Sequence, residues 1–319
     1  MPHDIHDAIV KKILALPEHM AAELRAVLPR EVSELLDFGT LELLSGSYVD
    51  ERLRETQSDL LFRVLTRDHE PVLIHVLFEH KSTPGPDLLD QVLGYKQRIW
   101  VDHRARHPAP AKLPPIIAVV LCHGRSTWSG PLEFCQRYPD TGSVARWSPY
   151  LLNFRLVMDD LAATDDSSLE RRDATPLLHL AWLVLKHGRY SADLHQRLMT
   201  NLRLWQLVAQ LPDGIMALNM LLDYIEQVSE HVDANQLQQL AAAAHPEVER
   251  TMATVREQLR EQWTQAGSRA MLDKQLRRKF GDLPPARDSL EHATPQQLDL
   301  WAERILTAQR LEDVFDPRA

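Results

Sequence analysis

The segment Gln57-Ser-Asp-Leu-Leu-Phe-Arg-Val-Leu65, followed after a short turn by Val72-Leu-Ile-His-Val-Leu-Phe-Glu-His-Lys-Ser82, decides the fold of this chain. The second run is apolar from Val72 to Phe78, which is typical of a strand buried on both faces, and it then ends in charged residues. Residues 67–71 are polar and include a proline, so the two runs are predicted to be neighbouring strands of a β-hairpin.

Three charged residues fall at one end of this predicted hairpin. Because side chains alternate along a strand, Glu79 and Lys81 project from the same face, and pairing brings Asp59 opposite Glu79. Two carboxylates can share a hard divalent cation, for which we expect Mg²⁺, with Mn²⁺ or Ca²⁺ as alternatives. Such a cation neutralises a phosphodiester and its leaving oxygen, while Lys81 orients or deprotonates the attacking water. A plainer interpretation stays open, in which Glu79 and Lys81 form a salt bridge and Asp59 marks a strand edge.

The wider pattern predicts an α/β fold with three regions. Helices are expected near 4–16, 17–28 and 86–105, and strands near 41–49, 56–66, 71–80 and 115–122, with a further short strand at 150–154 before an acidic break at 159–166. Residues 174–264 show apolar residues at helical spacing, and helices are also expected at 271–281 and 295–307. The predicted boundaries are 1–160 for the mixed domain, 161–264 for a helical region and 265–319 for a helical C-terminal tail.

The order of these motifs resembles the PD-(D/E)xK nuclease superfamily, with Asp59, Glu79 and Lys81 in its three motif positions. More narrowly, the chain resembles the recombination-promoting nuclease family, also described as YhgA-like transposases. The segments that carry the resemblance are His6-Asp7 before Lys11-Lys12, Leu43 to Leu61, Glu79-His-Lys-Ser82, Gln91-x-x-x-Tyr95 and Leu113 to Gly124.

The resemblance implies a restriction-endonuclease-like mixed sheet flanked by helices, followed by an α-helical C-terminal region. It also implies a metal-dependent DNA endonuclease that hydrolyses phosphodiester bonds and is associated with DNA recombination or mobile elements. Asp59 and Glu79 would bind the metal, and Asp7, Gln91 and Tyr95 would support the site from two helices.

Two other functions remain open. A catalytically weak member of the family would act as a DNA- or protein-binding module, which would suit the net charge of −9. A histidine and aspartate metal phosphohydrolase built on His3-Asp4 and His6-Asp7 is disfavoured, because the dispersed ligands of such a site are missing and these dipeptides suit an exposed helix start.

Charge is unevenly distributed along the chain. Residues 96–155 contain nine Lys or Arg against three Asp or Glu, a local excess of six positive charges. We expect this segment to contact DNA phosphates through Lys96, Arg98, Arg104 and Arg106, although a solvated helix with scattered loop arginines would give the same composition. Arg277, Arg278 and Lys279 suit either phosphate contact or the dipole at a helix end.

Composition sets further expectations. No apolar run is long enough to span a bilayer and no signal segment is recognisable, so we expect a cytoplasmic protein without a membrane partner. Two cysteines, Cys122 and Cys135, make neither a disulfide framework nor a zinc motif, and Cys122 is more typical of a buried strand thiol than of a nucleophile. The apolar helix faces of the tail would suit a homodimer.

Overall fold

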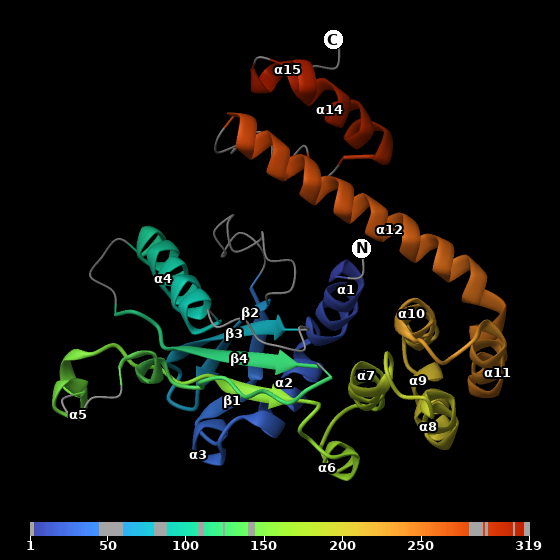
Figure 1. Cartoon of the computed structure of the whole chain (residues 1–319), viewed down its shortest axis with the longest axis horizontal. Coiled ribbons are helices and arrows are strands. Elements are labelled where there is room, and N and C mark those ends of the chain that lie inside the picture. The colour runs from blue at the N-terminus through green and yellow to red at the C-terminus, as the bar shows by residue number, and fades with distance from the viewer. Residues whose placement is uncertain are drawn as a thin grey trace. The chain divides into compact units, whose positions relative to one another are not determined.

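A five-stranded sheet organises the computed structural model, which describes residues 3–44, 60–79, 88–107, 112–123, 125–139, 144–280, 290, 293–308 and 310–315. In parts of some helices and at the end of one strand it describes the backbone alone. The strands are β1 Leu36–Leu43, β2 Leu60–Thr66, β3 Pro71–Glu79, β4 Ile116–Cys122 and β5 Val157–Asp160. They lie side by side in chain order, and Figure 1 labels β1 to β4 among the helices of this part of the chain. The first three are antiparallel and the last three are parallel, so the predicted mixed sheet is confirmed.

The predicted hairpin is formed by β2 and β3. Its register pairs Leu60 with Val76 and Leu65 with Pro71. On its other side β3 pairs with β4, and the side chains of Leu73, Ile74 and Val76 are at most 7% exposed. A strand with neighbours on both sides and helices on both faces is mostly apolar, which explains the run from Val72 to Phe78 with His75 as its one polar residue.

Strand β1 lies earlier in the chain than the predicted strand at 41–49. It contains a β-bulge, because its register with β2 shifts between Asp37 and Glu42. The Asp37 carboxylate accepts the N–H of Gly39 at 3.0 Å, and the Thr40 hydroxyl accepts the N–H of Leu65 at 2.9 Å. Asp37 and Gly39 are typical turn residues, but here the bulge accommodates them inside the strand.

The fifth strand also differs from expectation. Residues 150–154 form the end of a 3-10 helix and the loop after it, whereas β5 takes up the first residues of the predicted acidic break. Asp159 can lie in a buried strand because it is 3% exposed and its carboxylate pairs with Arg172 at 2.6 Å. A partner in the later loop between α6 and α7 thus offsets the charge penalty that the local sequence suggests.

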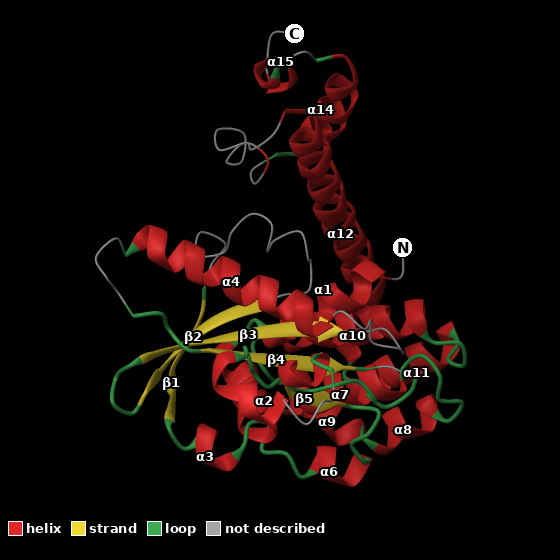
Figure 2. Ribbon diagram, turned by 60° about the vertical axis from the view of Figure 1, so that its left-hand side comes forward, coloured by secondary structure: helices red, strands yellow, loops and turns green. Residues whose placement is uncertain are grey.

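Helices cover both faces of the sheet, with α4 on one side and α2 on the other (Figure 2). Around the sheet the helices are α1 His3–Leu14, α2 Pro17–Val27, α3 Arg30–Ser33, α4 Leu88–Arg106, η3 Phe134–Arg137, α5 Val144–Trp147 and η4 Ser148–Tyr150. Helix α4 buries Leu88, Leu89, Val92, Tyr95 and Ile99, which share one helix face, against Leu61, Leu73, Ala118 and Val120 of the strands.

A bundle of helices completes the same compact unit, which spans Met1–Arg250. These helices are α6 Asp166–Glu170, α7 Pro176–His187, α8 Leu194–Thr200, α9 Leu202–Ala209, α10 Gly214–Val228 and α11 Ala234–Ala244. Helix α1 joins the bundle to the sheet, since its buried residues Ile9, Val10, Ile13 and Leu14 lie beside Leu121 of β4 and side chains of α7 and α10.

A second compact unit comprises Thr251–Ala319. The remaining helices are α12 Pro246–Phe280, α14 Pro295–Thr307 and α15 Leu311–Phe315. Leu276, Leu298, Trp301 and Val314 belong to its own buried apolar cluster. The helix expected at 295–307 is observed, but the residues expected to form a separate helix at 271–281 continue α12, so the predicted boundary at 264 falls inside a helix. In the described part of the chain, no helix combines the length and the apolarity that a membrane crossing needs.

Candidate functional site

The ends of four strands meet at the sheet edge where the motif was predicted. Strands β3, β4 and β5 end there at Glu79, Cys122 and Asp160, with Glu79 beside Cys122 and Cys122 beside Asp160. Strand β2 is antiparallel to β3 and therefore starts at this edge with Leu60. The carboxyl edge of parallel strands is the usual location of a site in α/β proteins.

The three predicted catalytic residues lie at or beyond the limits of the described chain. Asp59 and Lys81 fall outside the described residues, and for Glu79 only the backbone is described. Leu60, the residue after Asp59, pairs with Val76, three positions before Glu79. A hairpin with Asp59 directly opposite Glu79 would pair Leu60 with Phe78, so the described register is shifted by two residues from that expectation. Residues two apart on a strand share one face, and convergence of the three side chains stays a prediction.

Gln91 and Tyr95, predicted to support the site, contact each other on α4. The Gln91 amide donates a hydrogen bond to the Tyr95 hydroxyl at 3.0 Å. The Tyr95 ring meets the ring of His75 edge to face at 5.0 Å between centroids, and the Arg98 guanidinium lies over the same ring at 5.3 Å. These contacts connect the first turns of α4 with strand β3.

His75 is part of this cluster, and sequence reasoning missed it. It is 2% exposed and stands four residues before Glu79 in β3. Its signal in the sequence was a single polar residue inside the apolar run from Val72 to Phe78. Asp7, the other predicted supporting residue, lies on the backbone of α1, and its side chain is outside the described ones.

Lys96 does not occupy the surface position expected of a DNA contact. It is 6% exposed, its ammonium donates to the carbonyl of Ile116, and it lies 5.1 Å from the centre of the Phe154 ring. Burial lowers the pKa of Lys96 to about 8. An ammonium held in this way contributes to packing between α4 and β4. The charge of Lys96 is therefore not accessible for the predicted contact with DNA phosphates.

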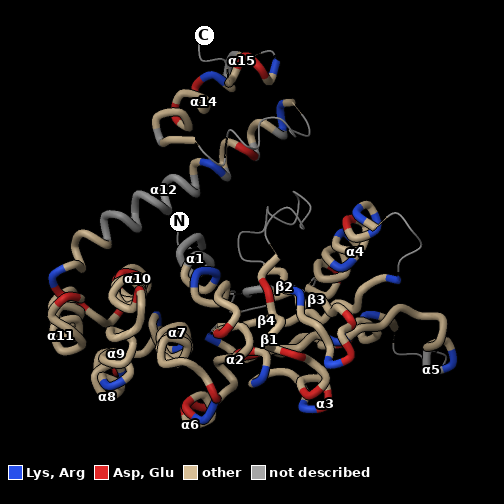
Figure 3. The backbone as a smooth tube through the Cα atoms, turned by 180° about the vertical axis from the view of Figure 1, so that it is seen from behind, with Lys and Arg blue, Asp and Glu red and all other residues tan. Residues whose placement is uncertain are grey.

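The three predicted arginines are spread along α4, where basic and acidic positions lie near one another (Figure 3). Since α4 connects the carboxyl end of β3 with the amino end of β4, its first turn is at the candidate edge and its last turn is at the opposite one. Arg104 lies about 24 Å along the helix from Leu88, by the usual rise per residue. Arg106 is paired with Asp102 at 2.9 Å. Lys96 is buried, and Arg104 and Arg106 lie towards the far end of the helix. Of the four predicted DNA contacts, Arg98 is therefore the solvent-accessible residue nearest the candidate edge.

Two further groups at this edge already have partners. The Asp160 carboxylate accepts the backbone N–H groups of Trp128, Ala162 and Ala163 at 2.6–3.2 Å. The Cys122 thiol is buried and lies 3.4 Å from the sulfur of Met158. These contacts favour structural roles for both. Among the residues whose side chains are described, no three His, Cys, Asp or Glu are grouped to hold a metal ion.

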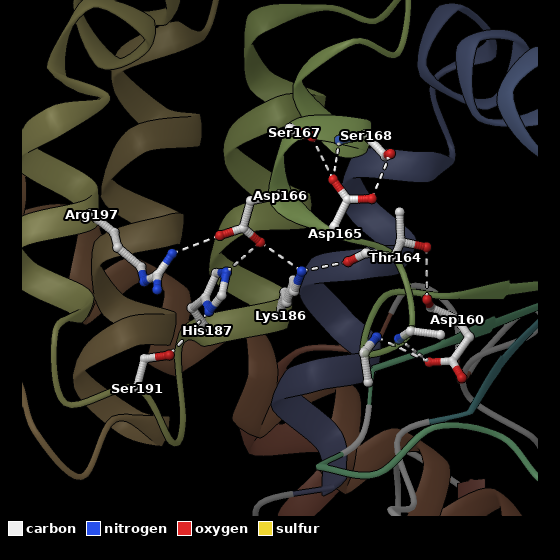
Figure 4. A network of polar contacts seen from close by, with 12 residues as sticks. Asp160, Thr164, Asp165, Asp166, Ser167, Ser168, Lys186, His187, Ser191 and Arg197 are labelled. Carbon is white, nitrogen blue, oxygen red and sulfur yellow. Dashed lines mark hydrogen bonds and ion pairs between the residues drawn. The ribbon is translucent and has the colours of Figure 1, made fainter.

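A polar network that the sequence did not predict surrounds Asp166 at the start of α6 (Figure 4). Its carboxylate contacts Lys186 at 2.6 Å, His187 at 3.0 Å and Arg197 at 2.6 Å. Burial opposes ionisation, but the hydrogen bonds from Lys186 and His187 outweigh it and lower the pKa of Asp166 to about 2. The network borders a cavity of about 320 Å³ and joins three helices, α6, α7 and α8.

A second buried network lies on the sheet face opposite α4. Glu23 of α2 is 1% exposed and accepts a hydrogen bond from the indole of Trp182 at 2.9 Å. Arg172 lies 3.9 Å from Glu23, pairs with Asp159 and stacks over the Trp182 ring. Burial and the Asp159 carboxylate raise the pKa of Glu23 well above its ordinary value. The network therefore joins α2, β5 and α7, and Glu23 keeps its proton to a higher pH than an ordinary glutamate does.

Three of the relatives found by comparison with known proteins share the name recombination-promoting nuclease. Over 188 residues the chain is 29% identical to recombination-promoting nuclease RpnD of Escherichia coli O157:H7. The aligned segment covers 58% of this chain and 68% of RpnD. It is 33% identical over 130 residues to RpnC of Escherichia coli K12, covering 41% of this chain and 42% of RpnC. It is 26% identical over 264 residues to RpnA of the same strain, covering 82% and 85%.

Other relatives from that strain have names that describe them as inactive. No solved structure matches the chain. The family model described as "Putative transposase, YhgA-like" matches residues 4–215. That segment includes the whole sheet and the helices up to α9, and it exceeds half of the chain. The protein therefore belongs to the YhgA-like transposase family.

Proposed function

We propose that this protein is a metal-dependent DNA endonuclease that hydrolyses phosphodiester bonds during DNA recombination or the movement of mobile elements. Asp59, Glu79 and Lys81 carry the reaction, and Mg²⁺, Mn²⁺ or Ca²⁺ is the cation. The nuclease names of RpnD, RpnC and RpnA support the reaction class.

The observation that carries the proposal is the register of the β2–β3 hairpin. It brings the start of β2, directly after Asp59, to the same end as the last residue of β3, Glu79. The first turn of α4 and the ends of β4 and β5 lie at that edge as well. A shared edge is what two carboxylates on neighbouring strands need in order to act together.

The donor chemistry of the three residues fits a hard cation. Carboxylate oxygens are the ligands that Mg²⁺ and Mn²⁺ prefer, and when bound such an ion supplies charge neutralisation for the phosphate and a more acidic water. Asp59 and Glu79 would hold the ion. The Lys81 ammonium would orient the attacking water, and Gln91 and Tyr95 would support Lys81 or the DNA strand from α4.

A second candidate function is a DNA- or protein-binding module with little catalysis. The relatives that are named inactive favour it, as does the net charge of −9. Binding without cleavage is the behaviour that separates this candidate from the endonuclease.

The decisive experiment incubates the purified full chain with supercoiled plasmid DNA in Mg²⁺, Mn²⁺ or Ca²⁺. We expect nicked or linear DNA with at least one of these ions and loss of cleavage on chelation. Asp59→Asn and Glu79→Gln should each reduce the rate by at least about 100-fold, since each removes a metal ligand.

Glu70→Gln is the matched control, because Glu70 is an exposed glutamate at the other end of the same hairpin. Its cleavage rate should equal that of the unmodified chain. DNA retention without cleavage under all three ions would favour the binding module, and unchanged cleavage in Asp59→Asn would refute the proposed site.

A further inference from the structure

Two histidines form a stacked pair in the last turn of α4. His103 and His107 are separated by four residues, so they lie one above the other on the same helix face. Their ring centroids are 4.3 Å apart and the ring planes differ by 25°. His107 is exposed and His103 is half-buried. Histidines at this helical spacing are the usual way in which one helix offers two imidazoles to a single metal ion.

A hydrogen bond within the pair fixes the tautomer of His107. The Nδ1 atom of His107 lies 2.9 Å from the carbonyl oxygen of His103. A carbonyl oxygen can only accept, so Nδ1 carries the proton and the lone pair of the neutral ring is on Nε2. Metal-binding histidines almost always donate their other ring nitrogen to a carbonyl or carboxylate in this manner.

The charged residues nearest the pair form an ion pair with each other. Asp102 and Arg106 occupy the same turn, and they are engaged with each other through two hydrogen bonds of 2.9 and 3.0 Å.

We propose that His103 and His107 form a binding site for a divalent transition metal ion, Zn²⁺, Ni²⁺ or Cu²⁺. Imidazole nitrogen suits these ions, whereas Mg²⁺ and Ca²⁺ prefer oxygen ligands. The described residues offer no third His, Cys, Asp or Glu to complete a cluster, so water molecules fill the other coordination positions. The two rings supply one chelate across a single helical turn.

This site is separate from the proposed catalytic metal in place and in chemistry. His103 is about 22 Å along α4 from Leu88, whose turn lies at the candidate edge. A chelate between two adjacent turns fixes the end of α4 in its helical conformation, because the ion binds the folded helix better than the unfolded chain. The expected consequence is metal-dependent stabilisation of the unit that contains α4.

The test uses the full chain without an affinity tag and titrates Zn²⁺, Ni²⁺ and Cu²⁺ by calorimetry. We expect one site that His103→Ala and His107→Ala each weaken by at least 10-fold. Electron paramagnetic resonance of the first Cu²⁺ equivalent should show two coordinated imidazole nitrogens in the unmodified chain and one in each variant. Zn²⁺ should raise the melting temperature of the unmodified chain more than that of either variant.

The control variant combines His107→Ala with Ala105→His. Position 105 is exposed, and this variant keeps the number of histidines while it changes the spacing from four residues to two. Residues two apart do not face each other on a helix, so binding should stay as weak as in His107→Ala. Equal affinity in the unmodified chain and in the spacing variant would overturn the proposal, as would a Cu²⁺ spectrum that neither substitution changes.

Discussion

Glu23 shows how a buried network can raise the pKa of one carboxyl group. Its carboxyl group lies in a region where the other carboxylate, Asp159, already pairs with the single guanidinium of Arg172. Removing a second carboxylate from water beside the first is unfavourable, so Glu23 retains its proton above its ordinary pKa of 4.5. Protonated Glu23 still accepts the hydrogen bond from Trp182.

The raised pKa of Glu23 predicts a pH-dependent stability. The folded state binds this proton more tightly than the unfolded state, so its contribution is fully present below about pH 4.5 and is lost as the pH rises towards the raised pKa. Glu23→Gln keeps the shape and the acceptor for Trp182 but cannot ionise. Between pH 5 and pH 8 the free energy of unfolding of Glu23→Gln should therefore rise relative to that of the unmodified chain.

Urea denaturation at several pH values measures this difference. Glu18→Gln is a suitable control, since Glu18 is exposed in the first turn of the same helix. Parallel stability curves for Glu23→Gln and the unmodified chain would show that Glu23 is ionised in the folded protein.

Lys96 and Arg98 are two residues apart on α4 but differ in their access to a ligand. Lys96 is buried against β4, whereas Arg98 is half-buried over the Tyr95 ring. If the protein binds DNA through this helix, Arg98→Gln should reduce the slope of log affinity against log salt by about one. Lys96→Met should leave that slope unchanged. Filter retention of a labelled duplex at four salt concentrations measures both slopes, and a reduced slope for Lys96→Met would contradict the structural role of the lysine.

At the scale of elements, the hairpin was predictable because its signals are local. An apolar run with a polar turn before it and charge after it gave β2 and β3 within a few residues, and the helices α1, α2, α4 and α14 followed from apolar spacing. Strands β1 and β5 were misplaced because their polar residues are satisfied by partners elsewhere. Asp159 needs Arg172, and the bulge near Asp37 needs β2 beside it.

The candidate site was predictable to a smaller extent. The sequence identified the edge at which β3 ends and placed Gln91 and Tyr95 on one helix, because both depend on short spacing. It missed the packing of His75 against Tyr95 and the network around Asp166, which join residues 20 or more apart in the chain. It also placed Lys96 on the surface, since a lysine in a helix gives no local sign of burial.

The bulge in β1 yields a prediction of its own. The Thr40 hydroxyl donates to the carbonyl of Asp37 at 2.7 Å and accepts the N–H of Leu65 at 2.9 Å. Thr40→Val keeps the β-branched shape but leaves that N–H without its acceptor, which should destabilise the fold by about 1–2 kcal/mol. Thr40→Ser retains the hydroxyl and should cost less. Chemical denaturation compares the three proteins, and equal stability of the valine variant would mean that water replaces the hydroxyl.

At the scale of the whole molecule, the chain forms two compact units. The candidate edge and the sheet belong to Met1–Arg250, while Thr251–Ala319 has an apolar cluster of its own. We expect a chain ending at Arg250 to fold cooperatively and to keep the cleavage activity proposed for the full chain. Circular dichroism, thermal unfolding and the plasmid assay test this together.

The division would be wrong if the shortened chain folds but cannot cut DNA with any of the three ions while the full chain does. Light scattering of both chains measures the other role expected of the C-terminal residues. If the tail mediates a homodimer, the full chain should have twice its monomer mass and the shortened chain should be a monomer.

The packing of α1 has a consequence for how the protein is made. Ile9, Val10, Ile13 and Leu14 are covered by α7 and α10, whose residues are translated long after α1 has left the ribosome. At ordinary rates of synthesis, roughly 5–20 residues per second, this apolar surface waits on the order of ten seconds or more for its partners. The apolar face of α1 is therefore exposed in the nascent chain for most of its synthesis. We expect chaperones that bind nascent chains to bind this face until α10 emerges.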